Sequence, residues 1–136
     1  MEEKKKEYTK EQQDEFMEIY DALMFNGEYS KQLTVSKNTS IVVKTRTGDE
    51  VFQVGQALEE LRPGTDYLVS SYLSLLNLAF SVSHFRGNDL SDIKPYPDRF
   101  NFFKKLPAPV LDILAGKLRE FDEKVSEATE YCKENF

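Results

Sequence analysis

The sequence predicts a small, mostly helical α+β domain that contains a β-hairpin or a three-stranded sheet. Three observations lead to this fold class. Residues 67–85 contain no Asp, Glu, Lys or Arg, although these types make up 31% of the chain, so this stretch predicts a buried helix. β-Branched residues with a period of two predict strands between residues 33 and 54. Apolar residues at helical spacing over 108–134 predict a long amphipathic helix.

Composition and charge limit the classes of function. The 136 residues suffice for one domain with a core, and the formal net charge is −6. An acidic chain lacks the basic surface that phosphate contacts need, so we expect no nucleic-acid partner. The start of the chain lacks the apolar region of a signal peptide, which favours a cytosolic location. We expect residues 1–8 to be a flexible charged lead-in and residues 9–136 to form a single domain.

The first helix is predicted over residues 10–25. Thr9 followed by Gln12 matches a capping box, in which each residue satisfies a free backbone N–H group at the start of a helix. Apolar residues at three- and four-residue spacing continue the pattern, and Gly27 ends it.

Two strands are predicted on either side of a turn at residues 46–49. Residues 40–45 and 50–54 alternate as strands do, and residues 36–39 favour an earlier turn. A sheet of two or three short strands is marginal alone in water, so it must pack on helices.

The central helix is predicted over residues 66–86. Residues 55–61 form a short helical turn before it, Thr65 or Asp66 caps its start, and Gly87 ends it. We expect this helix to be covered by the domain or by a partner, and not to span a membrane. Seven strongly polar side chains lie within it: Ser70, Ser71, Ser74, Asn77, Ser81, Ser83 and His84.

The last third of the chain predicts a loop and two helices. Residues 88–97 contain two prolines and predict a loop, and a short helix follows over 99–105. The long amphipathic helix over 108–134 then begins with prolines in its first turn. Its apolar residues alternate three and four positions apart: Leu111, Leu114, Leu118, Phe121, Val125, Ala128 and Cys132.

No pattern of reactive residues predicts a catalytic, cofactor or metal site. The only histidine is His84, which we expect to interact with the end of the central helix. The only cysteine is Cys132, which lies on an apolar stripe and is expected to be a packed structural residue. Neither zinc-ligand spacing nor a phosphate-binding loop occurs. We therefore expect no enzyme activity and no cofactor.

Two apolar surfaces are candidates for binding another protein. A helix of about 28 residues is roughly 40 Å long and outreaches a domain of this size, so its end is expected to project toward a partner. The alternative is that the helix packs entirely on its own domain. The candidate partner-binding residues are Leu118, Phe121, Val125 and Ala128 of this helix, with Phe100 and Phe103 of the short helix before it.

A series of short motifs occurs in a characteristic order between residues 41 and 120. Residues 44–50 (KTRTGDE) lead into a helix, and an apolar helix then closes on residues 85–90 (FRGNDL). Arg99 and residues 106–111 (LPAPVL) follow, before a charged helix. In this order the chain resembles the small tail-assembly proteins of tailed bacteriophages, namely tail assembly chaperones and baseplate-hub assembly proteins.

The resemblance implies a non-enzymatic protein that binds other phage tail or baseplate proteins. It implies a location in the host cytoplasm during assembly, with the finished virion as the other location, and a homo- or hetero-oligomeric state. It carries over no catalytic residue. Two other classes stay open: a small acidic regulatory or anti-host binding module, and an enzyme that uses His84, Cys132 or a carboxylate pair.

Overall fold

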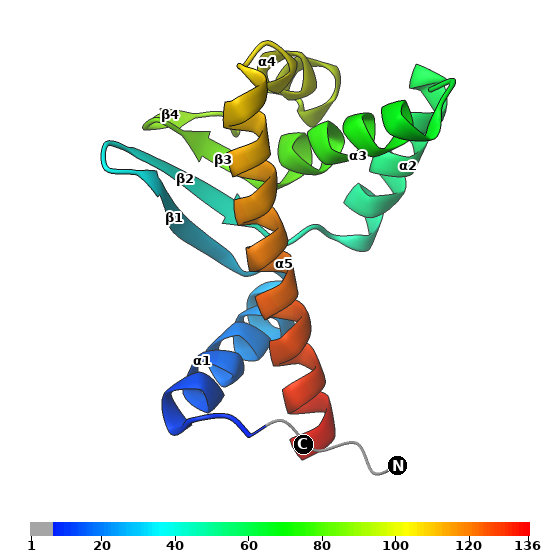
Figure 1. Cartoon of the computed structure of the whole chain (residues 1–136). Coiled ribbons are helices and arrows are strands. Elements are labelled where there is room, and N and C mark those ends of the chain that lie inside the picture. The colour runs from blue at the N-terminus through cyan, green and yellow to red at the C-terminus, as the bar shows by residue number, and fades with distance from the viewer. Residues whose placement is uncertain (1–6) are drawn as a thin grey trace.

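The structure is a computed structural model that describes residues 7–136. It confirms the predicted mostly helical α+β class, with a four-stranded antiparallel sheet of order β1-β2-β3-β4 (Figure 1). The predicted lead-in over residues 1–8 lies outside the described residues except for its last two. The elements are α1 (Lys10–Asp21), the π-helical turn η1 (Ala22–Asn26), β1 (Ser30–Ser36), β2 (Thr39–Lys44), α2 (Gly48–Leu61), α3 (Asp66–Ser81), β3 (Val82–Phe85), β4 (Asn88–Asp89), the π-helical turn η2 (Pro95–Arg99), α4 (Phe100–Lys104) and α5 (Ala108–Asn135).

The first helix begins at the predicted capping box. Thr9 Oγ1 accepts a hydrogen bond from the Gln12 backbone N–H at 3.2 Å, and Gln12 Oε1 accepts one from the Thr9 N–H at 2.9 Å. Two otherwise free N–H groups are thereby satisfied. After α1 the helix widens into η1 and ends at Gly27, whose φ of +77° favours glycine. The predicted helix over residues 10–25 is present, with a π-helical last turn.

The β-hairpin lies earlier in the chain than predicted. β1 and β2 pair antiparallel around the turn expected at residues 36–39. The second predicted strand, residues 50–54, is wrong because these residues belong to α2. A second capping box starts that helix: Thr47 Oγ1 accepts from the Glu50 N–H, and Glu50 Oε1 accepts from the Thr47 N–H, each at 3.1 Å.

The central helix, α3, is shorter than predicted. Its start is confirmed, since Thr65 Oγ1 accepts a hydrogen bond from the Leu68 N–H at 3.2 Å. The prediction that it reaches residue 86 is wrong, because the helix ends at Ser81 and residues 82–85 form β3 beside β2. An apolar run of this kind fits a buried helix or a buried strand equally well, and pairing with β2 decides between them.

A tight turn joins β3 to β4. Arg86 and Gly87 have φ values of +53° and +76°. A two-residue hairpin turn with the favoured twist requires positive φ at both positions. Gly87 therefore serves a hairpin and does not end a helix. The predicted loop over residues 88–97 is only partly irregular, because it contains β4 and the start of η2.

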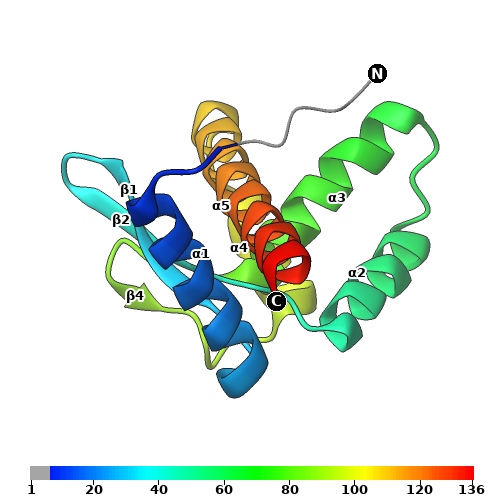
Figure 2. The same ribbon diagram turned by 90° about the horizontal axis from the view of Figure 1, so that it is seen from below.

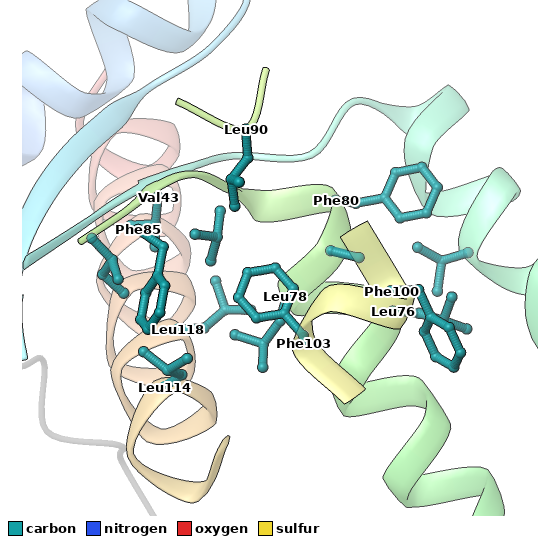
Figure 3. Packing of buried hydrophobic residues seen from close by; sticks show 14 of the residues in the cluster. Val43, Leu76, Leu78, Phe80, Phe85, Leu90, Phe100, Phe103, Leu114 and Leu118 are labelled. Atoms are coloured by element: carbon teal, nitrogen blue, oxygen red, sulfur yellow. The ribbon is translucent and has the colours of Figure 1, made fainter. Parts of the chain in front are cut away.

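The main core lies where α3, α4, α5 and the sheet meet (Figure 3). Figure 3 shows Phe103 of α4 near the centre of this packing, with Phe85 and Leu114 toward α5 and Leu76 toward α3. The buried apolar residues of the main core are Ile41, Val43, Val54, Ala57, Leu76, Leu78, Ala79, Phe80, Val82, Phe85, Leu90, Phe100, Phe103, Leu114, Leu118 and Phe121.

A second, smaller core joins α1 to the far half of α5. It consists of Phe16 and Ile19 from α1, with Ala128 and Cys132 from α5, and we call it the α1 core. Figure 1 shows α1 crossing the lower half of α5, below the sheet. The predicted long helix is confirmed as α5, and it contributes to both cores. No helix within residues 7–136 is both long enough and apolar enough to cross a membrane.

Candidate functional site

The six residues expected to bind a partner lie inside the protein's own packing. Phe103 and Ala128 are fully buried, and Phe100, Leu118 and Phe121 are at most 5% exposed. Val125 is partly buried and contacts both cores. The stripe along α5 is therefore covered by the domain itself, which was the alternative left open by the sequence. Five of these six side chains are almost completely buried, and Val125 keeps some exposed surface.

The two residues considered for nucleophilic chemistry lie far apart in the fold. His84 is on β3, and its Nε2 lies 3.6 Å from Asp89 Oδ1, so its predicted place at a helix end is wrong. Cys132 is 1% exposed in the α1 core, with its Sγ 3.7 Å from the Phe16 carbonyl oxygen, as a packed structural cysteine should be. Burial raises the pKa of the Cys132 thiol, which favours the unreactive protonated form.

The linker between β2 and α2 is held by two ion pairs. Lys44 Nζ lies 2.9 Å from both carboxylate oxygens of Glu50, and Arg46 Nη2 lies 2.7 Å from Asp122 Oδ2 on α5. The other arm of Arg46 donates to Ser81 Oγ at the end of α3. Partial burial raises the pKa of the Glu50 carboxyl, but hydrogen bonds from Lys44 and Thr47 outweigh this and lower the pKa. These motif residues thus fix three elements to one another.

Arg99 is a buried cation with backbone partners. It is 6% exposed, and its Nε donates to the carbonyl oxygens of Leu90 and Ile93, each at 2.8 Å. Its Nη1 donates to the Ala79 carbonyl at 3.2 Å. Burial lowers the pKa of the guanidinium, yet arginine stays charged at any physiological pH. Arg99 therefore ties the segment after β4 to the end of α3.

Within residues 7–136, no three His, Cys, Asp or Glu side chains are grouped so that they could hold a metal ion. The features that distinguish the surface are large apolar side chains on helices. Phe25 is 83% exposed at the end of η1, and Phe52 is 67% exposed in the first turns of α2. Tyr67, at the start of α3, is 78% exposed. These positions are the candidate interaction surface.

One of these surfaces is a shallow hollow along α1 and η1, which we call the α1 stripe. It combines apolar side chains with three carboxylates spaced three and four residues apart, so that they share one side of the helix. The sequence contained this signal, because position 25 continues the spacing of the acidic residues and not that of the inward-facing Phe16 and Ile19. The α1 stripe is lined by Asp14, Met17, Glu18, Asp21, Ala22, Phe25 and Asn26.

Figure 2 shows that α1 lies on the side of α5 opposite to α2 and α3. The α1 stripe and the exposed residues of α2 and α3 are therefore carried by different parts of the fold. Comparison with known proteins found no matching family model, curated protein or solved structure.

Proposed function

We propose that this chain is a non-enzymatic protein that acts through protein–protein contacts in the assembly of a bacteriophage tail or baseplate. The observation that carries the proposal is the exposure of Phe25, Phe52 and Tyr67 on helical surfaces. Aromatic side chains are enriched at protein interfaces, where their burial supplies much of the binding energy. The order of motifs in residues 41–120 supplies the connection to tail assembly.

The motif residues have structural roles that suit a binding scaffold. Arg46 and Glu50 fix the linker before α2, and Arg99 fixes the segment after β4. A scaffold of this kind holds exposed helices in place without using reactive groups. These structural roles support a function in binding.

The test is co-expression of the full chain with each tail-tube, tape-measure and baseplate protein encoded in the same genome. We expect at least one of them to co-elute with the chain in size-exclusion chromatography as a defined complex. Variants Phe25→Ala and Phe52→Ala identify which surface is used. A matched control is Lys37→Ala, which changes an exposed residue in the β1–β2 turn.

Failure of every such pair to form a complex would overturn the assignment to tail assembly. Loss of binding in the Lys37→Ala control as well would indicate a non-specific effect. Complex formation that survives both Phe substitutions would show that the exposed aromatic side chains are not the contact.

A further inference from the structure

We propose that the α1 stripe is a docking site for a basic amphipathic helix of a partner protein. The inference rests on the protein-binding part of the proposed function and not on the assignment to tail assembly, because it assigns a partner chemistry to one protein-binding surface. The stripe offers apolar contact along its length from Met17, Ala22 and Phe25. Met17 is 40% exposed and Phe25 is 83% exposed, and apolar surface rimmed by polar residues marks protein interaction sites.

Charge defines that partner. α1 carries five carboxylates and one lysine. Glu15 lies 3.0 Å from Lys124 and 3.8 Å from Lys31, so its charge is compensated within the fold. Asp14, Glu18 and Asp21, which line the stripe, take part in no ion pair within residues 7–136. Lysine or arginine side chains are the complementary groups.

Three other occupants are disfavoured by the same charges. A second copy docked through the same face would place the carboxylates of both stripes opposite one another, because a two-fold interface is self-complementary. An anionic membrane surface and a nucleic-acid backbone would both be repelled. A partner with basic residues flanking an apolar side chain would meet both the carboxylates and the apolar residues of the α1 stripe.

The geometry of the stripe indicates a helical partner. Its lining residues follow the helical spacing of positions 14, 17, 18, 21, 22 and 25, so the stripe runs along α1 and continues onto η1. A helix laid beside it meets apolar contacts along its length, with carboxylates at the rim. This is the arrangement by which amphipathic helices dock on grooves, with anchors at matching spacing.

The test uses two designed peptides and the full chain. One peptide is an amphipathic helix with leucine on one face and lysine and arginine beside it, and the other carries glutamate in place of every basic residue. We expect saturable binding of the basic peptide by titration calorimetry, with affinity that falls as salt increases. Amide chemical-shift changes should centre on residues 14–26.

Matched variants locate the contact. Phe25→Ala should weaken binding of the basic peptide by about tenfold or more, because burial of the ring is lost, whereas Phe52→Ala should leave it unchanged. Asp14→Asn, Glu18→Gln and Asp21→Asn combined should weaken binding and flatten its salt dependence. The control combines Asp49→Asn, Glu59→Gln and Glu60→Gln on the exposed side of α2.

Three results would overturn the inference: no saturable binding of the basic peptide, equal binding of the acidic peptide, or equal loss in the α2 control variants. Each of these results is independent of the co-expression test with tail proteins. A failed peptide test therefore leaves the proposed function standing, and a failed co-expression test leaves the docking site standing.

Discussion

Arg99 shows how a single residue can hold a segment that has little regular structure. The chain between β4 and η2 lacks a regular ladder of its own, and its carbonyl groups would be left without donors if they were buried. The guanidinium donates to the Leu90 and Ile93 carbonyls in this segment and to the Ala79 carbonyl at the end of α3; the Leu90 carbonyl also accepts from the Ile93 N–H. Its planar group of N–H donors makes arginine suited to this role, and lysine lacks that geometry.

Replacing Arg99 should therefore destabilise the domain strongly. We expect Arg99→Met to lower the free energy of unfolding by about 2–3 kcal/mol, because the Ile93 and Ala79 carbonyls lose the donor that Arg99 supplies, and Arg99→Lys to recover only part of that loss. Urea denaturation measures both. Arg119→Met is the matched control, since Arg119 is exposed on α5 and should change stability little. Equal stability of Arg99→Met and the control would contradict this account.

At the scale of the element, a helix cap determines that residues 50–54 form a helix, where apolar spacing alone fits either a helix or a strand. Residues 50–54 alternate as a strand does. Val54 is also followed by Ala57 and Leu61 at the three- and four-residue spacing of a helix. The Thr47–Glu50 capping box sets the start of a helix there. The equivalent capping box at Thr9 and Gln12 correctly predicts the start of α1.

The helix cap of α2 can be tested directly. Thr47→Ala should lower the free energy of unfolding by about 1 kcal/mol, because the Glu50 N–H loses its acceptor. Thr47→Ser keeps the hydroxyl group and should retain most of the stability. Thermal unfolding followed by circular dichroism compares the two. A Thr47→Ser variant as unstable as Thr47→Ala would show that the cap contributes little.

Sequence spacing predicted most of the helices but left open what their apolar sides contact, for a physical reason. Periodicity reveals which side of a helix is apolar, so the stripe of α5 was identified, but it does not reveal what covers that side. Whether Leu118 and Phe121 face a partner or their own core depends on where the sheet and α3 pack. Residues 82–85 became a strand for the same reason, since a neighbouring strand was available only in three dimensions.

At the scale of the whole molecule, α5 connects two cores of unequal size. The main core includes residues from the sheet and from α2, α3, α4 and α5, whereas the α1 core joins only α1 to the end of α5. Regions with fewer buried contacts open more readily. We therefore expect α1 to separate from α5 before the main core unfolds.

This order can be observed by hydrogen exchange. Ala128→Asp places a carboxylate in the α1 core and should reduce the protection of amides in α1 by about 3 kcal/mol, while amides of α3 and β3 keep theirs. Leu76→Asp should instead remove protection throughout, because Leu76 lies in the main core. Ser126→Asp, on the exposed side of α5, is the control. Uniform loss of protection in Ala128→Asp would show that the two cores unfold as one unit.

The length of α5 gives small rotations a large effect. A helix of 28 residues measures roughly 42 Å, so a tilt of about 10° about one end displaces the other by about 7 Å. Because α1 is attached to the far half of α5, such a tilt carries α1 along with it. A change in packing around Leu114 and Leu118 that tilted α5 would therefore move α1 much farther than it moved those two residues.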